Sequence, residues 1–143
     1  MKKIIALICA VLLCLSFTGC KKAAEPTPLT IEKAAELLTT ETTVWDITRW
    51  SVYNGALGTT QTGFKSCKIT VAVSAKQAVA LEGASITFDL IPNDQRYQTL
   101  TDQTLTLSAD GTASGIYKYE DKQEGDDNPS FTVRITNVSG TIQ

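Results

Sequence analysis

A two-residue alternation of apolar and polar side chains, repeated along most of the chain, constrains the possible fold more than any other feature of the sequence. The clearest example covers residues 84–90, where Ala, Ile, Phe and Leu alternate with Ser, Thr and Asp before Pro92 ends the run. Successive side chains of a β-strand point to opposite faces, so this segment predicts a strand with one apolar face and one polar face.

Further segments with the same period are separated by turn residues. The predicted strands cover about residues 44–53, 63–75, 84–90 and 131–136, with a short terminal strand at 141–143. Asn54-Gly55 is a strong turn signal after the first of them. We also expect a hairpin from Gln103 to Glu120 that turns at residues 109–111 and places Leu105 opposite Gly115.

The spacing of these segments indicates the fold class. Helical patterns are missing between the strands, so a parallel sheet is not expected. The sequence predicts an all-β fold, an antiparallel β-sandwich of immunoglobulin-like type. A short helix is expected after Thr30 from apolar residues at helical spacing, and the β-branched run at 39–44 is expected to end it.

A small β-barrel is the alternative fold. A short helix leading into a Trp-bearing strand, with an Asp-Gly-Thr hairpin later, resembles lipocalin-type lipoproteins at a few scattered positions. We carry no function over from that resemblance.

The N-terminus has the composition of a secretory signal. Two lysines precede the apolar run Ile4–Phe17, which is shorter than the roughly 20 residues that a membrane-spanning helix needs. Small residues then lead to Cys20. The predicted organisation is a signal peptide over residues 1–19, a lipidated N-terminus and spacer over 20–30, and a single β domain with its short helix over 31–143.

The segment Ser16-Phe17-Thr18-Gly19-Cys20 resembles the lipobox of bacterial lipoproteins. The resemblance implies that the Cys20 thiol receives a diacylglyceryl group, that a signal peptidase cuts before Cys20, and that the new amine is acylated. Phe17 departs from the family, which usually has leucine or another aliphatic residue there. Two or three acyl chains anchor a protein stably, so a membrane is an expected partner. By resemblance to Gram-negative sorting, Lys21 in place of aspartate implies the outer membrane of the cell envelope.

Composition argues against several functions. The 13 basic residues are scattered and 15 residues are acidic, so nucleic acid is not an expected partner. The sequence has no histidine, which excludes Ser-His-Asp and Cys-His catalysis and zinc sites of the histidine type. Asp46 and Asp89 fall on polar strand faces and are expected to be solvated. We therefore expect no enzyme activity, no cofactor and no metal site.

Two other features have simple interpretations. Five carboxylates between Glu120 and Asn128 do not have the spacing of a calcium loop, and Lys122 interrupts them, so a solvated loop is expected. Cys67 begins an alternating run and is expected to be a buried, inert thiol. If Cys20 carries a thioether, the two cysteines cannot form a disulfide.

Trp45 and Trp50 are the most informative candidates for binding. Five residues apart on a regular strand, they point to opposite faces, and we expect Trp45 in the core and Trp50 outside. Arg49, Trp50 and Tyr53 then form a possible binding surface, because exposed tryptophan beside arginine is typical of contact sites. A bulge near Thr48 would instead return Trp50 to the core.

These features predict a membrane-anchored cell-envelope lipoprotein that acts as a non-catalytic binding or accessory module for protein or glycan. The alternative is a carrier of a small apolar ligand inside a barrel.

Overall fold

The computed structural model describes residues 25–77, 79–81 and 83–143, so the predicted signal and Cys20 lie outside the described residues. The elements are β1 (Thr27–Pro28), α2 (Ile31–Leu37), β2 (Leu38–Asn54), β3 (Thr59–Ala75), β4 (Ser85–Pro92), β5 (Leu100–Thr106), β6 (Ala113–Glu124), β7 (Phe131–Ser139) and β8 (Thr141–Ile142).

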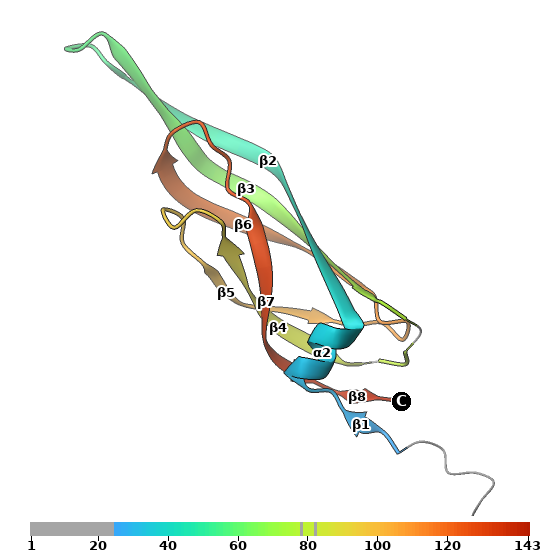
Figure 1. The fold of residues 1–143 in the computed structure, drawn as a ribbon. Helices are drawn as coiled ribbons and strands as arrows, with labels where there is room; N and C mark the ends of the chain where they lie inside the picture. Colours follow the sequence, from blue (N-terminus) through green and yellow to red (C-terminus); the bar gives the residue numbers. More distant parts are fainter. Residues whose placement is uncertain (1–24, 78, 82) are drawn as a thin grey trace, which may run out of the picture.

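Two antiparallel sheets of three strands pack against each other (Figure 1). One has the order β2-β3-β6 and the other the order β5-β4-β7, while β1 pairs with β8 in a separate small sheet. The sheets do not close on each other, so the predicted sandwich is confirmed and the lipocalin-like barrel is wrong. The alternative of a ligand carrier loses the barrel interior on which it depended.

The strand order follows the immunoglobulin arrangement. There, the first, second and fifth strands (A, B and E) share one sheet, and the third and sixth (C and F) share the other. The strands β2, β3 and β6 match A, B and E, and β4 and β7 match C and F, with β5 as an added neighbour of β4. The short β8 pairs with β1 and not with β7.

The core lies between the two sheets and is filled by side chains. Phe88 of β4 is fully buried and meets the ring of Tyr117 from β6 edge-on, with 5.6 Å between centroids. Tyr119 and Phe131 make a second edge-on contact at 4.8 Å. Aromatic pairs in this geometry add to the hydrophobic gain from burial. Cys67 is buried as predicted, and burial raises the pKa of its thiol to about 11.

The helix begins where the sequence predicts. The Thr30 hydroxyl accepts a hydrogen bond from the Lys33 amide at 3.3 Å, which caps α2, and Ala34 is buried against the body. The helix ends at Leu37, directly before the β-branched run, as expected. That run already belongs to β2, which begins at Leu38 and pairs with β3 from there, so the first strand starts earlier than the predicted residue 44. β-branched residues fit the pleated sheet well.

The predicted hairpin over residues 103–120 is wrong. A tight turn does form there, with Gly111 at φ 75° and the Ser108 amide bonded to the Thr112 carbonyl. However, β5 and β6 belong to different sheets. Leu105 does face Gly115, but across the sandwich: a Cβ on Gly115 would lie 2.9 Å from the leucine. Alternation therefore predicted that Leu105 and Gly115 meet, but it did not show that they belong to different sheets.

Asp89 also differs from expectation. Its side chain is buried, with its residue only 6% exposed, and it accepts a hydrogen bond from Arg134 at 2.8 Å and one from the Asp102 amide at 3.1 Å. The bond from Arg134 holds the pKa of this carboxyl below its ordinary value. The acid therefore links β4 to β7 and to β5.

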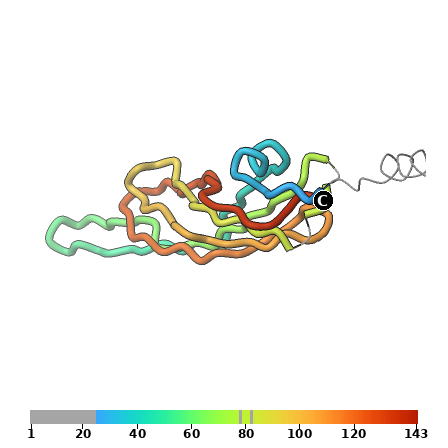
Figure 2. Tube along the Cα trace, turned by 90° about the horizontal axis from the view of Figure 1, so that it is seen from below, coloured from blue at the N-terminus to red at the C-terminus, as the bar shows by residue number. Residues whose placement is uncertain are grey.

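The two ends of the molecule differ. The hairpin that joins β2 and β3 extends beyond the rest of the body at one end, and the β1–β8 pair lies at the other (Figures 1 and 2). The chain that leads to Cys20 therefore enters the body at the end opposite the hairpin tip.

Candidate functional site

A bulge in β2 decides where the two tryptophans lie. The pairing of β2 with β3 shifts between Trp45 and Thr48, and Asp46 takes a left-handed conformation with φ 51°. A bulge inserts an extra residue and so changes which later side chains face outward. As a result Trp45, Thr48 and Trp50 all lie on the outer face of the β2-β3-β6 sheet.

Trp45 was predicted to enter the core, and that prediction is wrong: the residue is 40% exposed. Its indole Nε1 donates to the Thr70 hydroxyl at 2.9 Å. Lys68 Nζ lies 4.9 Å from the ring centre and forms an ion pair with Asp46 at 2.9 Å. The bulge thus positions Asp46 to hold a lysine over the tryptophan.

Trp50 lies outward as predicted, but it is half-buried. Its indole Nε1 donates to the Gln123 carbonyl at 3.1 Å, and Lys122 Nζ lies 4.6 Å from the ring centre. The ring rests directly over Gly63, where an added Cβ would lie 2.6 Å from Nε1. Glycine at this position lets the indole cross from β2 to β6.

We call Trp45, Lys68, Trp50 and Lys122 the tryptophan face. Each ring carries a lysine ammonium on one side, an arrangement stabilised by the attraction of a cation to an aromatic ring. Ile116 lies on the same sheet face and is 62% exposed. The tryptophan face itself therefore combines two aromatic rings and two cations, and Ile116 lies outside it on the same side of the sheet.

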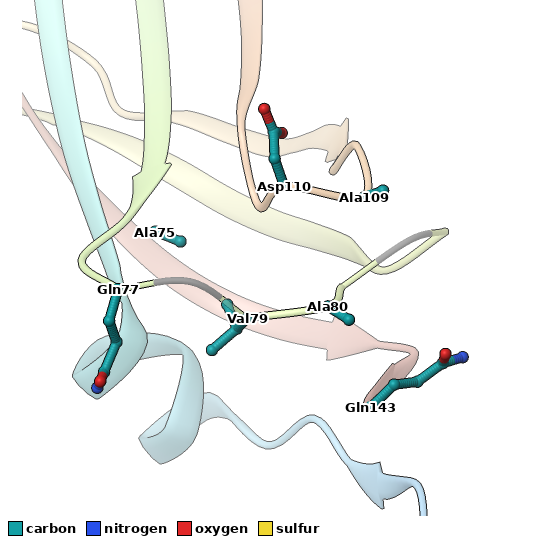
Figure 3. Close-up of a pocket in the computed structure, with 7 residues that line it drawn as sticks. All are labelled: Ala75, Gln77, Val79, Ala80, Ala109, Asp110 and Gln143. Atoms are coloured by element: carbon teal, nitrogen blue, oxygen red, sulfur yellow. The ribbon is translucent and has the colours of Figure 1, made fainter.

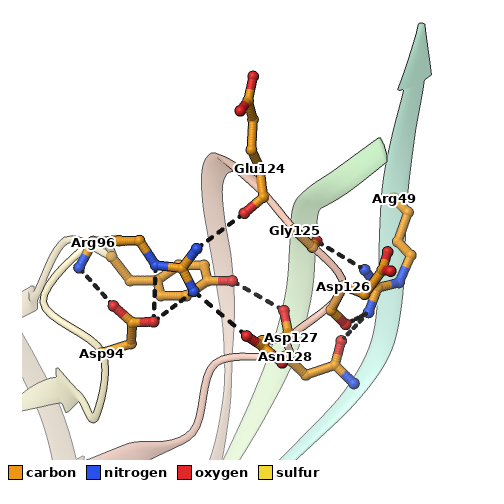
Figure 4. A network of polar contacts seen from close by, with 9 residues as sticks. Arg49, Asp94, Arg96, Glu124, Gly125, Asp126, Asp127 and Asn128 are labelled. Atoms are coloured by element: carbon orange, nitrogen blue, oxygen red, sulfur yellow. Dashed lines mark hydrogen bonds and ion pairs between the residues drawn. The ribbon is translucent and has the colours of Figure 1, made fainter. Parts of the chain in front are cut away.

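Arg49 does not join this face. It pairs with Phe64, whose side chain is in the core, and so points to the other side of the sheet from Trp50. Its guanidinium donates to the Asp126 carbonyl at 2.5 Å and to Asn128 Oδ1 at 2.6 Å (Figure 4). The arginine thus holds the loop after β6 against the base of the hairpin.

A second arginine holds the same loop from the other side. Arg96 binds the Asp94 carboxylate at 2.6 Å, donates to the Glu124 carbonyl at 3.1 Å, and lies 3.7 Å from the Asp127 carboxylate (Figure 4). The hydrogen bonds from Arg96 hold the pKa of Asp94 below its ordinary value. The prediction of one solvated loop from Glu120 to Asn128 is only partly right: residues 120–124 belong to β6, with Asp121 half-buried, and only residues 125–128 form an exposed loop. The two arginines bind this shorter loop.

Tyr53 lies away from both residues with which it was grouped. It belongs to the part of the β2–β3 hairpin that extends past the body, and it is 68% exposed. Two further exposed apolar residues lie nearby, Val52 at 51% and Leu57 at 73%, and sequence reasoning missed them. The sequence does carry a signal for this apolar segment, because no charged residue occurs between Arg49 and Lys65.

The predicted surface of Arg49, Trp50 and Tyr53 is therefore not brought together. Arg49 is committed to a loop, Trp50 belongs to the tryptophan face, and Tyr53 belongs to the hairpin tip. The structure replaces one predicted site by two separate surfaces.

Two hollows on the described surface, near the C-terminus and beside α2, do not bring polar groups together at one point. The larger, about 630 Å³, lies between loops near the C-terminus, where Gln77, Asp110 and Gln143 point in different directions (Figure 3). Asp110 is occupied within its own turn by Ser108 and Thr112. A smaller apolar groove of about 270 Å³ lies between α2, β2 and β7 and is lined by Ile31, Ala35, Leu38, Thr40, Val133 and Ile135.

Within residues 25–77, 79–81 and 83–143, no group of three or more His, Cys, Asp or Glu residues is placed to hold a metal ion. The described part of the chain also contains no helix with the length and apolar character that crossing a bilayer requires. No family model, curated protein or solved structure matches this chain.

Proposed function

We propose that this protein is a non-catalytic binding module, lipid-anchored in the cell envelope, that engages a protein or a glycan through the tryptophan face. The observation that carries the proposal is the bulge at Asp46, which places Trp45 and Trp50 on one outer sheet face. Tryptophan is enriched in residues that dominate binding energy, and its flat ring also stacks on sugar rings.

The charge of the face supports a polar partner. Lys68 and Lys122 lie over the two rings, and the Lys68 ammonium is shared with Asp46. A partner that stacks on either ring displaces a lysine, which can then bind acidic groups of the partner. An acidic glycan or an acidic protein surface fits this arrangement better than an apolar ligand.

The anchor is proposed on the basis of the lipobox resemblance at Cys20. The position of the β1–β8 pair supports it, because the described chain enters the body at this end, opposite the hairpin between β2 and β3. With a lipid on Cys20 and Lys21 next to it, the outer membrane is the proposed location. Intact mass of the membrane-extracted protein, compared with Cys20→Ala, tests the lipid directly.

A non-catalytic role agrees with the state of the polar groups near the candidate surfaces. Three acids near these surfaces are held in ion pairs: Asp89 with Arg134, Asp94 with Arg96, and Asp46 with Lys68. The sequence contributes no histidine to act as a base.

The binding test uses the protein from residue 20 onward, with purified peptidoglycan and detergent-solubilised envelope proteins as the two probes. We expect one probe to bind, and Trp45→Ala and Trp50→Ala each to weaken that binding. Ile116→Ala is the matched control, because Ile116 is exposed on the same face and carries no ring. A protein that binds neither probe, or that binds equally well in both tryptophan variants, contradicts the proposal.

A further inference from the structure

The hairpin between β2 and β3 continues beyond the sandwich as a two-stranded ribbon. Pairing of β3 with β6 ends at Gly63, whereas β2 and β3 pair with each other as far as Asn54 and Thr59. We call residues 52–61 the ribbon. Every one of its residues is exposed, and the ribbon extends from the end of the body opposite β1 (Figures 1 and 2).

Exposed apolar side chains occur on both faces of the ribbon and in its turn. Val52 and Tyr53 are neighbours on a strand and so point to opposite faces, yet they are 51% and 68% exposed. Leu57, in the connecting turn, is 73% exposed. A flat protein surface would cover only one face of this ribbon, whereas a bilayer interface surrounds a protruding tip.

The ribbon is also built without charge. No Asp, Glu, Lys or Arg occurs from Trp50 to Phe64, in a chain in which 20% of residues are charged. A tip that enters a lipid interface must not carry charges, because their transfer out of water is costly. Tyrosine suits such a boundary, since its ring is apolar and its hydroxyl is polar.

Two backbone amides of the turn are bonded within it. The Asn54 side-chain oxygen accepts hydrogen bonds from the Ala56 amide at 3.1 Å and from the Leu57 amide at 3.3 Å. Amides bonded within the turn lose little when water is removed. The open edges of the two strands lack such partners, so only the tip can enter the interface.

We infer that the ribbon tip, with Val52, Tyr53 and Leu57, inserts into the interfacial layer of a lipid bilayer. Three partly apolar side chains give weak and reversible binding, weaker than that of a single acyl chain. Because the tip lies opposite the end that leads to Cys20, an upright anchored molecule presents it to a facing bilayer. The inference goes beyond the binding of protein or glycan and uses a different surface.

The test is flotation with vesicles of phosphatidylethanolamine and phosphatidylglycerol. The protein from residue 20 onward carries Cys20→Ser, so that no lipid anchor contributes. We expect the protein to float with the vesicles, and Leu57→Asp to lower partitioning by roughly tenfold or more, because an apolar contact is lost and a charge is added. Binding should persist in high salt, since the contact is not ionic.

Ile116→Asp is the matched control, because it adds the same charge at an exposed apolar residue outside the ribbon. We expect this variant to float like the parent. Absence of flotation, flotation unchanged by Leu57→Asp, or loss of flotation in high salt overturns the inference. Thermal unfolding of each variant checks that the body is intact. These results are independent of Cys20 lipidation and of Trp45 and Trp50, so failure here is distinct from failure of the proposed function.

Discussion

The β2–β3 hairpin has two parts with the same secondary structure and opposite surroundings. In the body, the inward residues from Cys67 to Val73 are at most 2% exposed, because the second sheet covers them. In the ribbon, residues 52–61 are all exposed, because neither β6 nor the second sheet extends that far. Backbone pairing alone therefore does not decide stability. A two-stranded hairpin by itself is marginally stable in water, so the body must hold the ribbon in place.

The largest expected difference between the two parts is in the effect of removing a side chain. Phe88→Ala in the body should lower the free energy of unfolding by about 3–5 kcal/mol, because the ring is fully buried and its removal leaves a cavity. Val52→Ala in the ribbon should change it by less than about 0.5 kcal/mol. Urea unfolding of both variants measures the contrast, and similar losses would mean that the ribbon is part of the core.

The junction between the two parts should be the next most sensitive. Gly63→Ala places a Cβ 2.0 Å from the Gln123 carbonyl and 2.6 Å from the Trp50 ring, so we expect a loss of about 1–3 kcal/mol, as in overpacked sites. Gly55→Ala in the ribbon is the control, since its Cβ would meet only the Tyr53 ring at an ordinary 3.8 Å. Equal unfolding midpoints in urea would show that Trp50 does not rest on Gly63.

Acid should lower the folding stability that the body contributes, through Asp89, and should not change the uncharged ribbon. Asp89 has a lowered pKa in the folded state, chiefly through the Arg134 hydrogen bond. Its stabilising contribution is therefore present above the unfolded pKa, about 3.9, and is lost as pH falls through the folded value. Arg134→Met should lower stability at neutral pH and reduce the further loss in acid.

Urea midpoints measured from neutral pH down to acid test this expectation. Lys118→Met is the control, because Lys118 pairs with Glu120 on the exposed surface at 2.6 Å. Exposed pairs contribute little, so its curve should stay close to that of the parent. If the urea midpoint of Arg134→Met fell with pH as steeply as that of the parent, the role assigned to the ion pair of Asp89 and Arg134 would be contradicted.

The smallest expected effect on stability is in the ribbon tip. Leu57→Asp and Tyr53→Ser should leave the free energy of unfolding within about 0.5 kcal/mol of the parent value, because neither side chain is buried. The same substitutions are expected to weaken the contact with lipid. If these variants lost folding stability to the same degree as they lost lipid binding, the ribbon could not be treated as separate from the stabilising body.

Much of this architecture follows from the sequence. Alternation predicted the sandwich, the burial of Cys67 and the turn after Asn54, because each depends on local periodicity or turn chemistry. The pairing of Leu105 with Gly115 was inferred correctly as a contact and wrongly as a neighbour in one sheet. Periodicity gives the face of a strand and carries no information on which sheet the strand joins.

The candidate surfaces were harder to predict. Trp45 was assigned to the core because side chains were assumed to alternate regularly along the strand. The bulge at Asp46 breaks this alternation, so that Trp45 and Trp50 face the same side of the sheet. Arg49 was assigned to a surface, and its contacts with residues 126 and 128 depend on a distant loop. The absence of charge over residues 50–64 marks the segment in the sequence, but its extension past the body is recognisable only when the end of β6 is known.

Amide hydrogen exchange, resolved by residue and repeated with vesicles, tests the central claim most directly. Without lipid, the amides from Cys67 to Val73 should exchange near the limit set by global unfolding, and those of the ribbon should exchange much faster. With vesicles present, protection should rise at residues 53–57 and stay unchanged in the body. Uniform protection along β2 and β3, or a tip that exchanges equally fast with and without vesicles, would contradict the division into a stabilising body and a contacting ribbon.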